Sequence, residues 1–599
     1  MRMLLLAGVA CASVCAWADT AYPVPAGTAE ANLKKVLAFK ENAYWKAAPF
    51  AVAAVDPVAG VRRTPDAFPE DGDFTGPVRA LLAKGEYEGA SFLLYGFDDV
   101  EGVHAQVNVP GVEADVKIVK VWYQSGTSWG SFFSDHTRRV ATPELMVHDD
   151  DVLFVDHEDK ENYIRCDYSK GNSAYRWVSF EGRAVDHSGY GGINTDWIHD
   201  APALKPFKLP KGEFKQLIVT FHAPANAQPG LKKGSIALSV KGKKVCDVPA
   251  EVKVLPFELP LPATFRDLNR RFFAAPYGGF GGYEPANEKK MRNMVAHNVR
   301  NCLLPGITTP SEAKKAYDMF KRCGFDTEHL FTALPGCAIT TSYPAKETDG
   351  AYANYVNATN SYAKAMDAIR EVFGPTVKAY SYGIDEGSAW AVRAERATWK
   401  GVHRAGGNTI VATQWHPFIL FNLDFANVPR HPRAAKRKNA DAYHDGNPGG
   451  IMGWYADPHS GPENPDYTRR IYGWQTWRNN YDASCQYILA RDNWNDFWIP
   501  AEAFLRGLML VYPQAGDFLD TIEWEGLREG MDDVRYGTLL KQLGQKCNQS
   551  KDMDTVYAGR AALTWVAQVD CERSELKYLR YEMVRRILDL QARLAKEDK

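Results

Sequence analysis

The sequence lacks a long hydrophobic run beyond its first residues and carries no excess of charge of one sign. Its 71 lysines and arginines balance 73 aspartates and glutamates, giving a formal net charge of -2. Without a positive field to hold phosphate groups, we expect no nucleic-acid partner. Without a further apolar run of 18 or more residues, we expect no stable membrane insertion.

Closely spaced cysteines are also missing. The chain has 10 cysteines, of which Cys11 and Cys15 lie in the first apolar run, and none of the others forms a CxxC pair. Wide spacing of this kind argues against a zinc cluster, and no motif indicates another cofactor, so we expect neither metal nor cofactor. We interpret most of these cysteines as buried thiols, although an oxidising compartment would permit disulfides.

The first residues have the pattern of a secretory signal. Arg2 precedes an apolar run over residues 3–14, and Ala16-Trp17-Ala18 follows as a small-x-small cleavage pattern. The run is too short for a membrane span, which needs about 20 residues. We therefore expect residues 1–18 to be a signal peptide and the mature protein to be exported, to the periplasm or the extracellular medium.

Residues 19–262 read as a β domain. Hydrophobic residues make up 45% of the chain, enough for more than one core, and short β-branched runs recur between turn residues. Such runs are residues 89–95, 116–122, 216–222 and 234–240. Strands joined by turns predict a β-sandwich, and three prolines in residues 254–262 mark its end.

After Pro262 the pattern changes to strands alternating with amphipathic helices. Helices are expected at 287–297, 312–323 and 352–373. Eight candidate strands lie at 265–273, 299–304, 328–332, 377–385, 409–414, 423–428, 450–455 and 483–490. Eight such units predict a (β/α)8 TIM-type barrel over 263–548, followed by a helical extension over 549–599.

The fourth predicted strand ends in two adjacent carboxylates, Asp385 and Glu386, followed by Gly387. A barrel places its reactive groups at the carboxyl ends of its strands. Both side chains can reach one substrate only if the backbone turns there, which Gly387 permits. The two acids are therefore candidate catalytic residues. In the alternative interpretation they are first-turn acids of the helix that begins near Ser388.

Aromatic and polar side chains at other strand ends suit the floor of a sugar pocket, because flat rings pack against the C–H faces of sugars. Each of them could instead pack in the core. These candidate substrate-binding residues are Tyr382, Gln414, Trp415, His416, Trp454, Tyr455, Asn493 and Trp494.

The order of sandwich, proline-rich joint and barrel resembles glycoside hydrolase family 123. The segments that carry the resemblance are 382–386, 470–477, 487–494 and 525–536. It implies a retaining, exo-acting hydrolase of glycans with terminal β-linked N-acetylgalactosamine, in which the 2-acetamido oxygen of the substrate is the nucleophile. By this resemblance Asp385 orients the acetamido N–H, and Glu386 protonates the leaving oxygen and then activates water.

Two alternatives stay open. In one, Glu386 is the acid/base and a separate acid, Asp457, is the nucleophile of a retaining glycosidase that acts on other sugars. In the other, the protein binds glycans without cleaving them. For Arg528, Glu529, Asp532 and Asp533, which follow the last strand on a predicted helix, we expect internal ion pairs.

Overall fold

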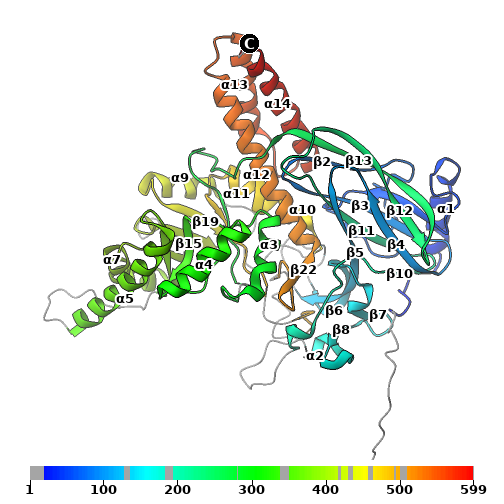
Figure 1. Ribbon diagram of the computed structural model, residues 1–599, viewed down its shortest axis with the longest axis horizontal. Coiled ribbons are helices and arrows are strands. Elements are labelled where there is room, and N and C mark those ends of the chain that lie inside the picture. The colour runs from blue at the N-terminus through cyan, green and yellow to red at the C-terminus, as the bar shows by residue number, and fades with distance from the viewer. Residues whose placement is uncertain are drawn as a thin grey trace, which may run out of the picture.

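The computed structural model describes residues 19–126, 132, 135–181, 193–278, 281–336, 350–415, 420–429, 436–455, 463–490, 494–498 and 509–597. The predicted signal peptide lies outside this range. Two β-containing parts flank the long helix α12 (Ile522–Cys547), and a helical pair projects from its end (Figure 1). None of the described helices has the length and apolar character that a bilayer crossing requires.

The first part contains two larger sheets and one small sheet. Their strand orders are β1-β3-β11-β5-β6-β22-β21, β10-β4-β12-β13-β2 and β7-β8-β9. The strands are β1 (Phe50–Val55), β2 (Val78–Lys84), β3 (Tyr87–Gly96), β4 (Val100–Asn108), β5 (Glu113–Gly126), β6 (Asp135–Val147), β7 (Leu153–Asp156), β8 (Glu161–Asp167), β9 (Ser173–Trp177), β10 (Phe207–Leu209), β11 (Phe214–His222), β12 (Gly230–Val240), β13 (Lys243–Glu258), β21 (Tyr512–Gln514) and β22 (Asp517–Thr521). Its short helices are α1 (Thr28–Leu37), η1 (Lys40–Asn42), η2 (Asp150–Val152), η3 (Ser169–Gly171), α2 (Val178–Glu181) and η4 (Thr195–Trp197).

Side chains of the two larger sheets share one hydrophobic core. Phe92 and Trp122 from the first sheet and Leu238 and Val252 from the second belong to the same buried cluster. Neighbouring strands are antiparallel, except that β2 and β13 are parallel. The predicted runs at 89–95, 116–122, 216–222 and 234–240 lie within β3, β5, β11 and β12. Here the period-two pattern of the sequence identifies the strands.

Two strands of the first sheet come from a distant part of the chain. β22 pairs antiparallel with β6, with Asp520 opposite Met146 and Thr521 opposite Leu145, and β21 pairs with β22. Both strands follow the second part in sequence and return to the edge of the first sheet. The sequence pattern assigned these residues to the barrel, because it does not show which edge a strand joins.

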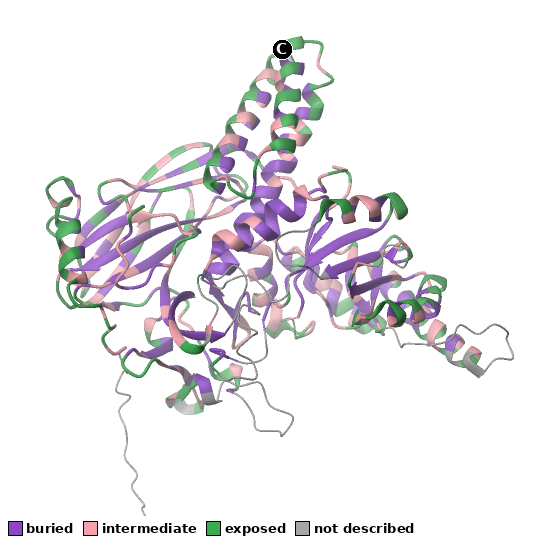
Figure 2. Cartoon of the chain, turned by 180° about the vertical axis from the view of Figure 1, so that it is seen from behind, coloured by how far each residue is buried: buried purple, intermediate pink, exposed green. Residues whose placement is uncertain are grey.

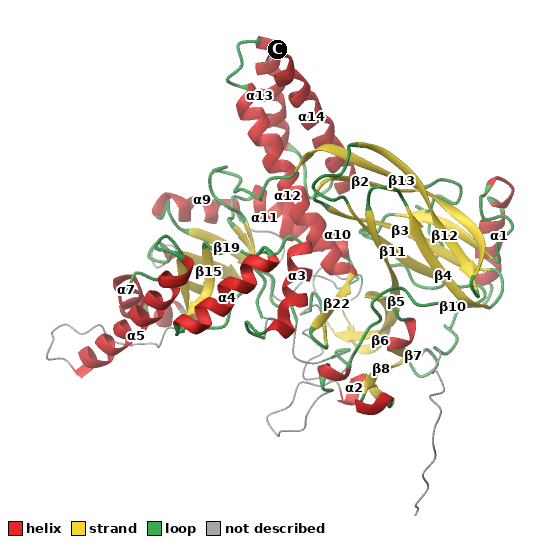
Figure 3. Ribbon diagram, in the orientation of Figure 1, coloured by secondary structure: helices red, strands yellow, loops and turns green. Residues whose placement is uncertain are grey.

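The second part is built on a parallel sheet in which the structure describes seven strands, in the order β14-β20-β19-β18-β17-β16-β15. They are β14 (Phe273–Ala274), β15 (His329–Leu334), β16 (Lys378–Gly387), β17 (Asn408–Thr413), β18 (Phe425–Pro429), β19 (Ile451–Tyr455) and β20 (Ala483–Ser484). The helices around them are η5 (Pro285–Asn287), α3 (Glu288–Ala296), α4 (Pro310–Cys323), α5 (Gly350–Phe373), α6 (Ala389–Ala394), α7 (Arg396–Arg404), α9 (Arg437–Gly446), α10 (Pro465–Thr468), the π-helix η6 (Arg469–Gln475) and α11 (Thr476–Arg478). Figure 3 shows the strands of this sheet with helices packed outside them.

The segment predicted as a strand at 299–304 is not regular, yet it contacts both edges of this sheet. The Leu303 amide donates to the Pro276 carbonyl beside β14 at 3.4 Å, and the Leu304 amide donates to the Phe331 carbonyl of β15 at 3.0 Å. Of the first predicted strand, 265–273, only Phe273 lies in a strand, the two-residue β14. The prediction of the second part is therefore met in part, by a parallel α/β sheet with seven assigned strands.

The chain ends in the helices α12, α13 (Met553–Gln568) and α14 (Leu576–Glu597). Figure 2 shows that α12 is largely buried, whereas the far ends of α13 and α14 are exposed. Glycines let α12 approach the α10–η6 helices closely. A Cβ atom added at Gly530 would lie 2.8 Å from the Arg469 carbonyl, and one at Gly526 would lie 2.4 Å from the Pro465 carbonyl. The two glycines in Glu525-Gly-Leu-Arg-Glu-Gly530 are thus needed for helix packing.

All seven described cysteines are buried and none forms a disulfide with another described one. They are Cys166, Cys246, Cys302, Cys323, Cys485, Cys547 and Cys571. Among these residues the interpretation as buried thiols is confirmed. Cys337 lies outside the described residues.

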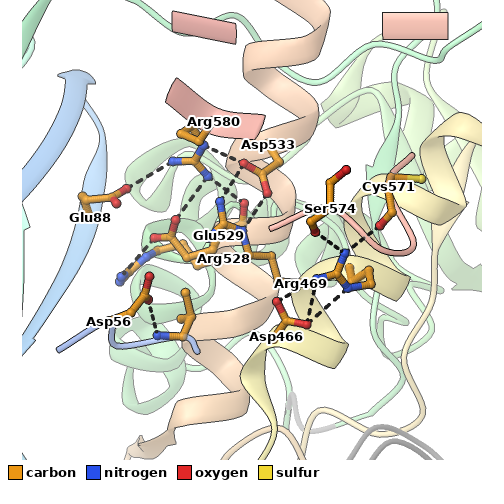
Figure 4. Close-up of polar contacts among 12 residues, drawn as sticks. Asp56, Glu88, Asp466, Arg469, Arg528, Glu529, Asp533, Cys571, Ser574 and Arg580 are labelled. Carbon is orange, nitrogen blue, oxygen red and sulfur yellow. Dashed lines mark hydrogen bonds and ion pairs between the residues drawn. The ribbon is translucent and has the colours of Figure 1, made fainter. Parts of the chain in front are cut away.

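A buried cluster of charges joins α12 to α14 and to the first part (Figure 4). The Arg580 guanidinium of α14 donates to Asp533 Oδ1 at 2.6 Å, to Glu529 Oε2 at 3.1 Å and to Glu88 Oε2 of β3 at 3.2 Å. Arg469 donates to both carboxylate oxygens of Asp533, at 2.7 and 3.0 Å. Ion pairs were expected for this helix, and they are the contacts that connect three distant segments of the chain.

Arg528 and Asp532 of α12 also form ion pairs. Arg528 donates to Glu525 Oε1 at 3.1 Å, and Asp532 accepts from Arg535 at 2.8 Å. Both Arg528 and Asp532 are 1% exposed. The expected internal pairing of these residues is confirmed.

Arg580 is surrounded by several acids at once. The side chains within 4 Å of its guanidinium are Glu86, Glu88, Glu529 and Asp533. Burial first, and then the neighbouring Asp532 charge, raise the pKa of Glu86 to about 8 against the opposing effect of Arg580. Burial and Glu529 likewise raise the pKa of Glu88. Glu86 is therefore largely protonated at neutral pH in the folded protein.

We predict that Arg580→Met strongly destabilises the protein. The substitution removes the shared cation of three buried acids and of the partly buried Glu88, a change that typically costs about 3–5 kcal/mol. Arg585→Met is the matched control on the same helix, because Arg585 pairs with Glu582 at the surface. Chemical denaturation of the two variants measures the difference, and equal free energies of unfolding would show that the cluster is unimportant.

We also predict that Glu86→Gln flattens the pH dependence of stability. The folded-state pKa of Glu86 lies above its unfolded value, so its contribution is complete below about pH 4.5 and is lost progressively up to about pH 8. Over this pH range the contribution of Glu86 to the free energy of unfolding falls by on the order of 1 kcal/mol per pH unit. Melting temperatures at pH 5, 6.5 and 8 for wild type, Glu86→Gln and the surface control Glu70→Gln test this. A slope in Glu86→Gln equal to that of wild type contradicts it.

Candidate active site

The two candidate acids lie on a bulged strand end. Opposite β17, Tyr382 pairs with Ile410 and Asp385 with Ala412, so β16 uses three residue steps where β17 uses two. A second extra step follows before Gly387. Glu386 has a φ of 47°, in the left-handed region. The bulge interrupts the strict alternation of side chains, as two neighbouring acids on one strand require.

A buried carboxylate holds this bulge in place. The Ile384 amide donates to Glu395 Oε1 and Oε2 at 2.9 and 3.1 Å, and Glu395 is 0% exposed. Trp399 Nε1 donates to the same carboxylate at 3.1 Å. Only glycine fits at position 383, because an added Cβ would lie 2.5 Å from Glu395 Oε2. Sequence reasoning missed Glu395, because its position between α6 and α7 gave no local signal.

Each candidate acid accepts a hydrogen bond from its own tyrosine. Tyr382 Oη donates to Asp385 Oδ1 at 2.7 Å, and Tyr455 Oη, from the end of β19, donates to Glu386 Oε1 at 2.6 Å. Both carboxylate side chains are otherwise exposed. Two acids from one turn thus face tyrosines that line the inner side of the sheet.

A third tyrosine, Tyr277, lies between these two. Its ring centroid is 6.1 Å from that of Tyr382 and 5.7 Å from that of Tyr455. Its amide donates to the Gln486 carbonyl at 2.8 Å, which fixes it just beyond β14. Sequence reasoning missed Tyr277, because nothing in the sequence shows that it meets β16 and β19.

Burial keeps all three phenols protonated. The pKa of Tyr382 is raised far above its usual value by burial first and then by Tyr277 and Asp385. Burial, followed by the hydrogen bond to Glu386, raises the pKa of Tyr455 in the same way. Near neutral pH these side chains are therefore hydrogen-bond donors to the carboxylates.

The other predicted sugar-binding residues are divided between the sheet end and the core. Gln414 is exposed and Trp415 half-buried, both directly after β17, at the same end of the sheet as the acids. Trp415 packs against the hydrophobic cluster outside the sheet. His416 and Asn493, with the alternative nucleophile Asp457, lie outside the described residues.

Trp454 and Trp494 are core residues, which corrects their prediction as sugar contacts. Trp454 precedes Tyr455 on β19 and points to the opposite side, where it packs on Tyr472 at 5.3 Å between centroids. Trp494 is 0% exposed in the core of the first part and donates its Nε1 proton to the Pro513 carbonyl at 2.9 Å. Tryptophan is favoured both in sugar sites and in cores, so residue type alone did not separate them.

One group of potential metal ligands occurs among the described residues, formed by Asp326, Glu328 and His329. Asp326 already pairs with the Arg271 guanidinium at 2.5 Å and lies 3.3 Å from His329 Nδ1. Against the opposing effect of burial, the His329 hydrogen bond and the Arg271 charge together lower the pKa of Asp326. With a permanent cation on its buried acid, the group is better explained as an ion pair than as a metal site.

No family model matches the sequence, and no curated protein matches it either. Among solved structures the chain is similar to a family 123 glycoside hydrolase from Clostridium perfringens, studied for glycolipid glycan hydrolysis, with a TM-score of 0.55 at 10% identity over 92% of this chain and 100% of the other. A β-glucuronidase from Parabacteroides merdae, at 9% identity over 75% and 50% of the two chains, reaches a TM-score of only 0.29. The chain therefore has the fold of a family 123 glycoside hydrolase.

Proposed function

We propose that this protein is a retaining glycoside hydrolase that removes terminal β-linked N-acetylhexosamine, with N-acetylgalactosamine favoured, from glycans. The observation that carries the proposal is the bulged end of β16, where Asp385 and Glu386 are both exposed and each is held by its own tyrosine. The fold similarity to a family 123 enzyme supports it.

In the proposed reaction the acetamido oxygen of the substrate attacks C1 while the glycosidic bond breaks. Asp385 accepts a hydrogen bond from the acetamido N–H and so orients the group. Tyr382 donates to the other carboxylate oxygen, Asp385 Oδ1, and fixes the position of the carboxylate. Protonated Glu386 donates its proton to the leaving oxygen. Glu386 then takes a proton from the water that opens the cyclic intermediate at C1, which restores the acid and gives net retention.

The position of the two acids favours this route over direct double displacement. A separate enzyme nucleophile has to lie about 5–5.5 Å from the acid/base, across the scissile bond. Adjacent residues of one bulge come from the same side of a sugar, where they can serve C1 and C2. The alternative with Asp457 is retained as an outcome of the experiment below.

We propose as well that the protein is exported after cleavage behind Ala18. Asp19 and Thr20 are already part of the fold, since Asp19 Oδ1 accepts from the Val155 amide at 2.9 Å and Thr20 Oγ1 accepts from the His157 amide at 2.6 Å. For the architecture we propose a β-sandwich, in which the two larger sheets are the layers, and a (β/α)8 barrel closed by residues 299–307 between β14 and β15.

We predict that Asp385→Asn and Glu386→Gln each lower kcat/KM on an aryl β-N-acetylhexosaminide by about 10²–10⁴-fold, since each removes a group that acts on the reacting atoms. Asp318→Asn, a surface acid paired with Lys314 on α4, is the matched control and keeps full activity. The measurement is hydrolysis of chromogenic β-glycosides with and without the 2-acetamido group, and inhibition by a thiazoline mimic of the cyclic intermediate.

Activity on sugars with a plain 2-hydroxyl would instead support a separate nucleophile. Binding without turnover of any glycan, retained in Glu386→Gln, would support a glycan-binding protein. A loss below tenfold for Glu386→Gln would remove it from the mechanism.

We predict that Tyr455→Phe lowers kcat by about tenfold or more, because it removes a charge-assisted hydrogen bond to Glu386. The loss should grow as the leaving group becomes a weaker acid, since Glu386 has to protonate it. Tyr317→Phe on α4, whose ring packs on Phe373, is the control. A uniform loss across leaving groups would argue that Tyr455 does not act through Glu386.

A further inference from the structure

Asn427 is a buried amide on the inner side of the parallel sheet. It lies on β18, pairs with Ala412 of β17 and is 0% exposed. Ala412 is also the residue that Asp385 pairs with on the other side, so Asn427 lies two strands from Asp385 at the same level. Neighbouring inward residues such as Phe425, Ile410 and Ile451 are apolar.

The amide of Asn427 is only partly satisfied. Its Nδ2 donates to Tyr277 Oη at 2.5 Å, whereas its buried Oδ1 has no hydrogen-bond partner among the described residues. A half-satisfied buried amide is costly, and an apolar side chain of the same size would cost less. Packing alone therefore gives no reason for an asparagine here.

The hydrogen bond from Asn427 sets the direction of the next ones. The hydroxyl oxygens of Tyr277 and Tyr382 lie 3.5 Å apart, a contact that the proton of either phenol could bridge. Because Tyr277 Oη already accepts from Asn427, its own proton is available for this contact. Tyr382 has a single proton, and a carboxylate can only accept, so that proton goes to Asp385 Oδ1 at 2.7 Å. The result is one chain of donors that runs from Asn427 to Asp385.

We propose that Asn427 is a positioning residue that acts through Tyr277 and Tyr382 to keep Asp385 oriented as a hydrogen-bond acceptor for the acetamido N–H. This inference rests on the proposed function and deepens it. The chain serves Asp385 alone: Tyr455, which holds Glu386, contacts Tyr277 through its ring, and within the described part of the molecule the two hydroxyls form no hydrogen bond with each other.

The test reverses the first donor. Asn427→Asp keeps the size of the side chain, and its carboxylate form can only accept, so at a pH where it is ionised Tyr277 has to donate toward residue 427 and Tyr382 loses its support. We expect kcat on an aryl β-N-acetylhexosaminide to fall about tenfold with KM unchanged, the effect of about one hydrogen bond. Tyr277→Phe should give a similar loss, and the double variant should lose no more than either alone.

Two features separate this role from a structural one. Asn427→Leu should keep or raise the melting temperature and still lower kcat. If Asn427→Asp does not fold, the kcat of Asn427→Leu tests the positioning role instead. The losses should also be the same for good and poor leaving groups, in contrast to Tyr455→Phe. Additive losses in the double variant would overturn the inference, and so would full activity of Asn427→Asp or of Asn427→Leu. The proposed function would still stand in these cases, provided that wild type hydrolyses the substrate.

Failure of the proposed function has a different signature, since wild type would then hydrolyse no 2-acetamido glycoside. Crystal structures of wild type and Asn427→Leu still test the inference in that case. We expect Tyr382 Oη to leave hydrogen-bond distance of Asp385 Oδ1 in the variant. An unchanged contact between these two atoms overturns the positioning role.

Discussion

The structure depends on one buried cation, Arg580. Its guanidinium reaches acids of β3 and of α12 and therefore joins the first sheet and α12 to the last helix, α14. Burying a charge without partners is prohibitive, so the arginine and its acids constrain one another to a single arrangement. With α12 fixed in this way, its glycines lock it against the α10–η6 helices that lead out of β19. The position of the candidate active site relative to the first part follows from these contacts.

Near the candidate catalytic acids, too, a buried charged group fixes the position of its partners. Glu395, which is buried behind β16, accepts the hydrogen bond from the Ile384 amide and so determines where the strand bulges. The bulge brings Asp385 and Glu386 out together, and two different tyrosines then hold them. Two residues with nearly the same chemistry thereby acquire different surroundings, and different surroundings are what allow acids to take different roles.

Much of this was open to sequence reasoning, and the limits have physical causes. Strands β15 to β19 lie close to their predicted positions because their apolar runs are long and bounded by turn residues. The acids were found because a strand end followed by glycine is a local signal. Glu395, Tyr277 and Asn427 were missed because their roles arise from contacts across the sheet, which no local pattern records. Trp494 was misassigned for the same reason, since burial depends on partners such as Trp122 that are distant in sequence.

The return of β21 and β22 to the first sheet means that the whole parallel sheet is inserted between strands of another unit. Excision of residues 263–548 as an independent fragment would carry these strands away and expose the backbone of β6 as a bare edge, a template for intermolecular pairing. The gene segment that encodes the candidate active site is thus not a portable module. Any shuffling of this architecture has to cut at both ends of the insertion, ahead of β14 and ahead of β21.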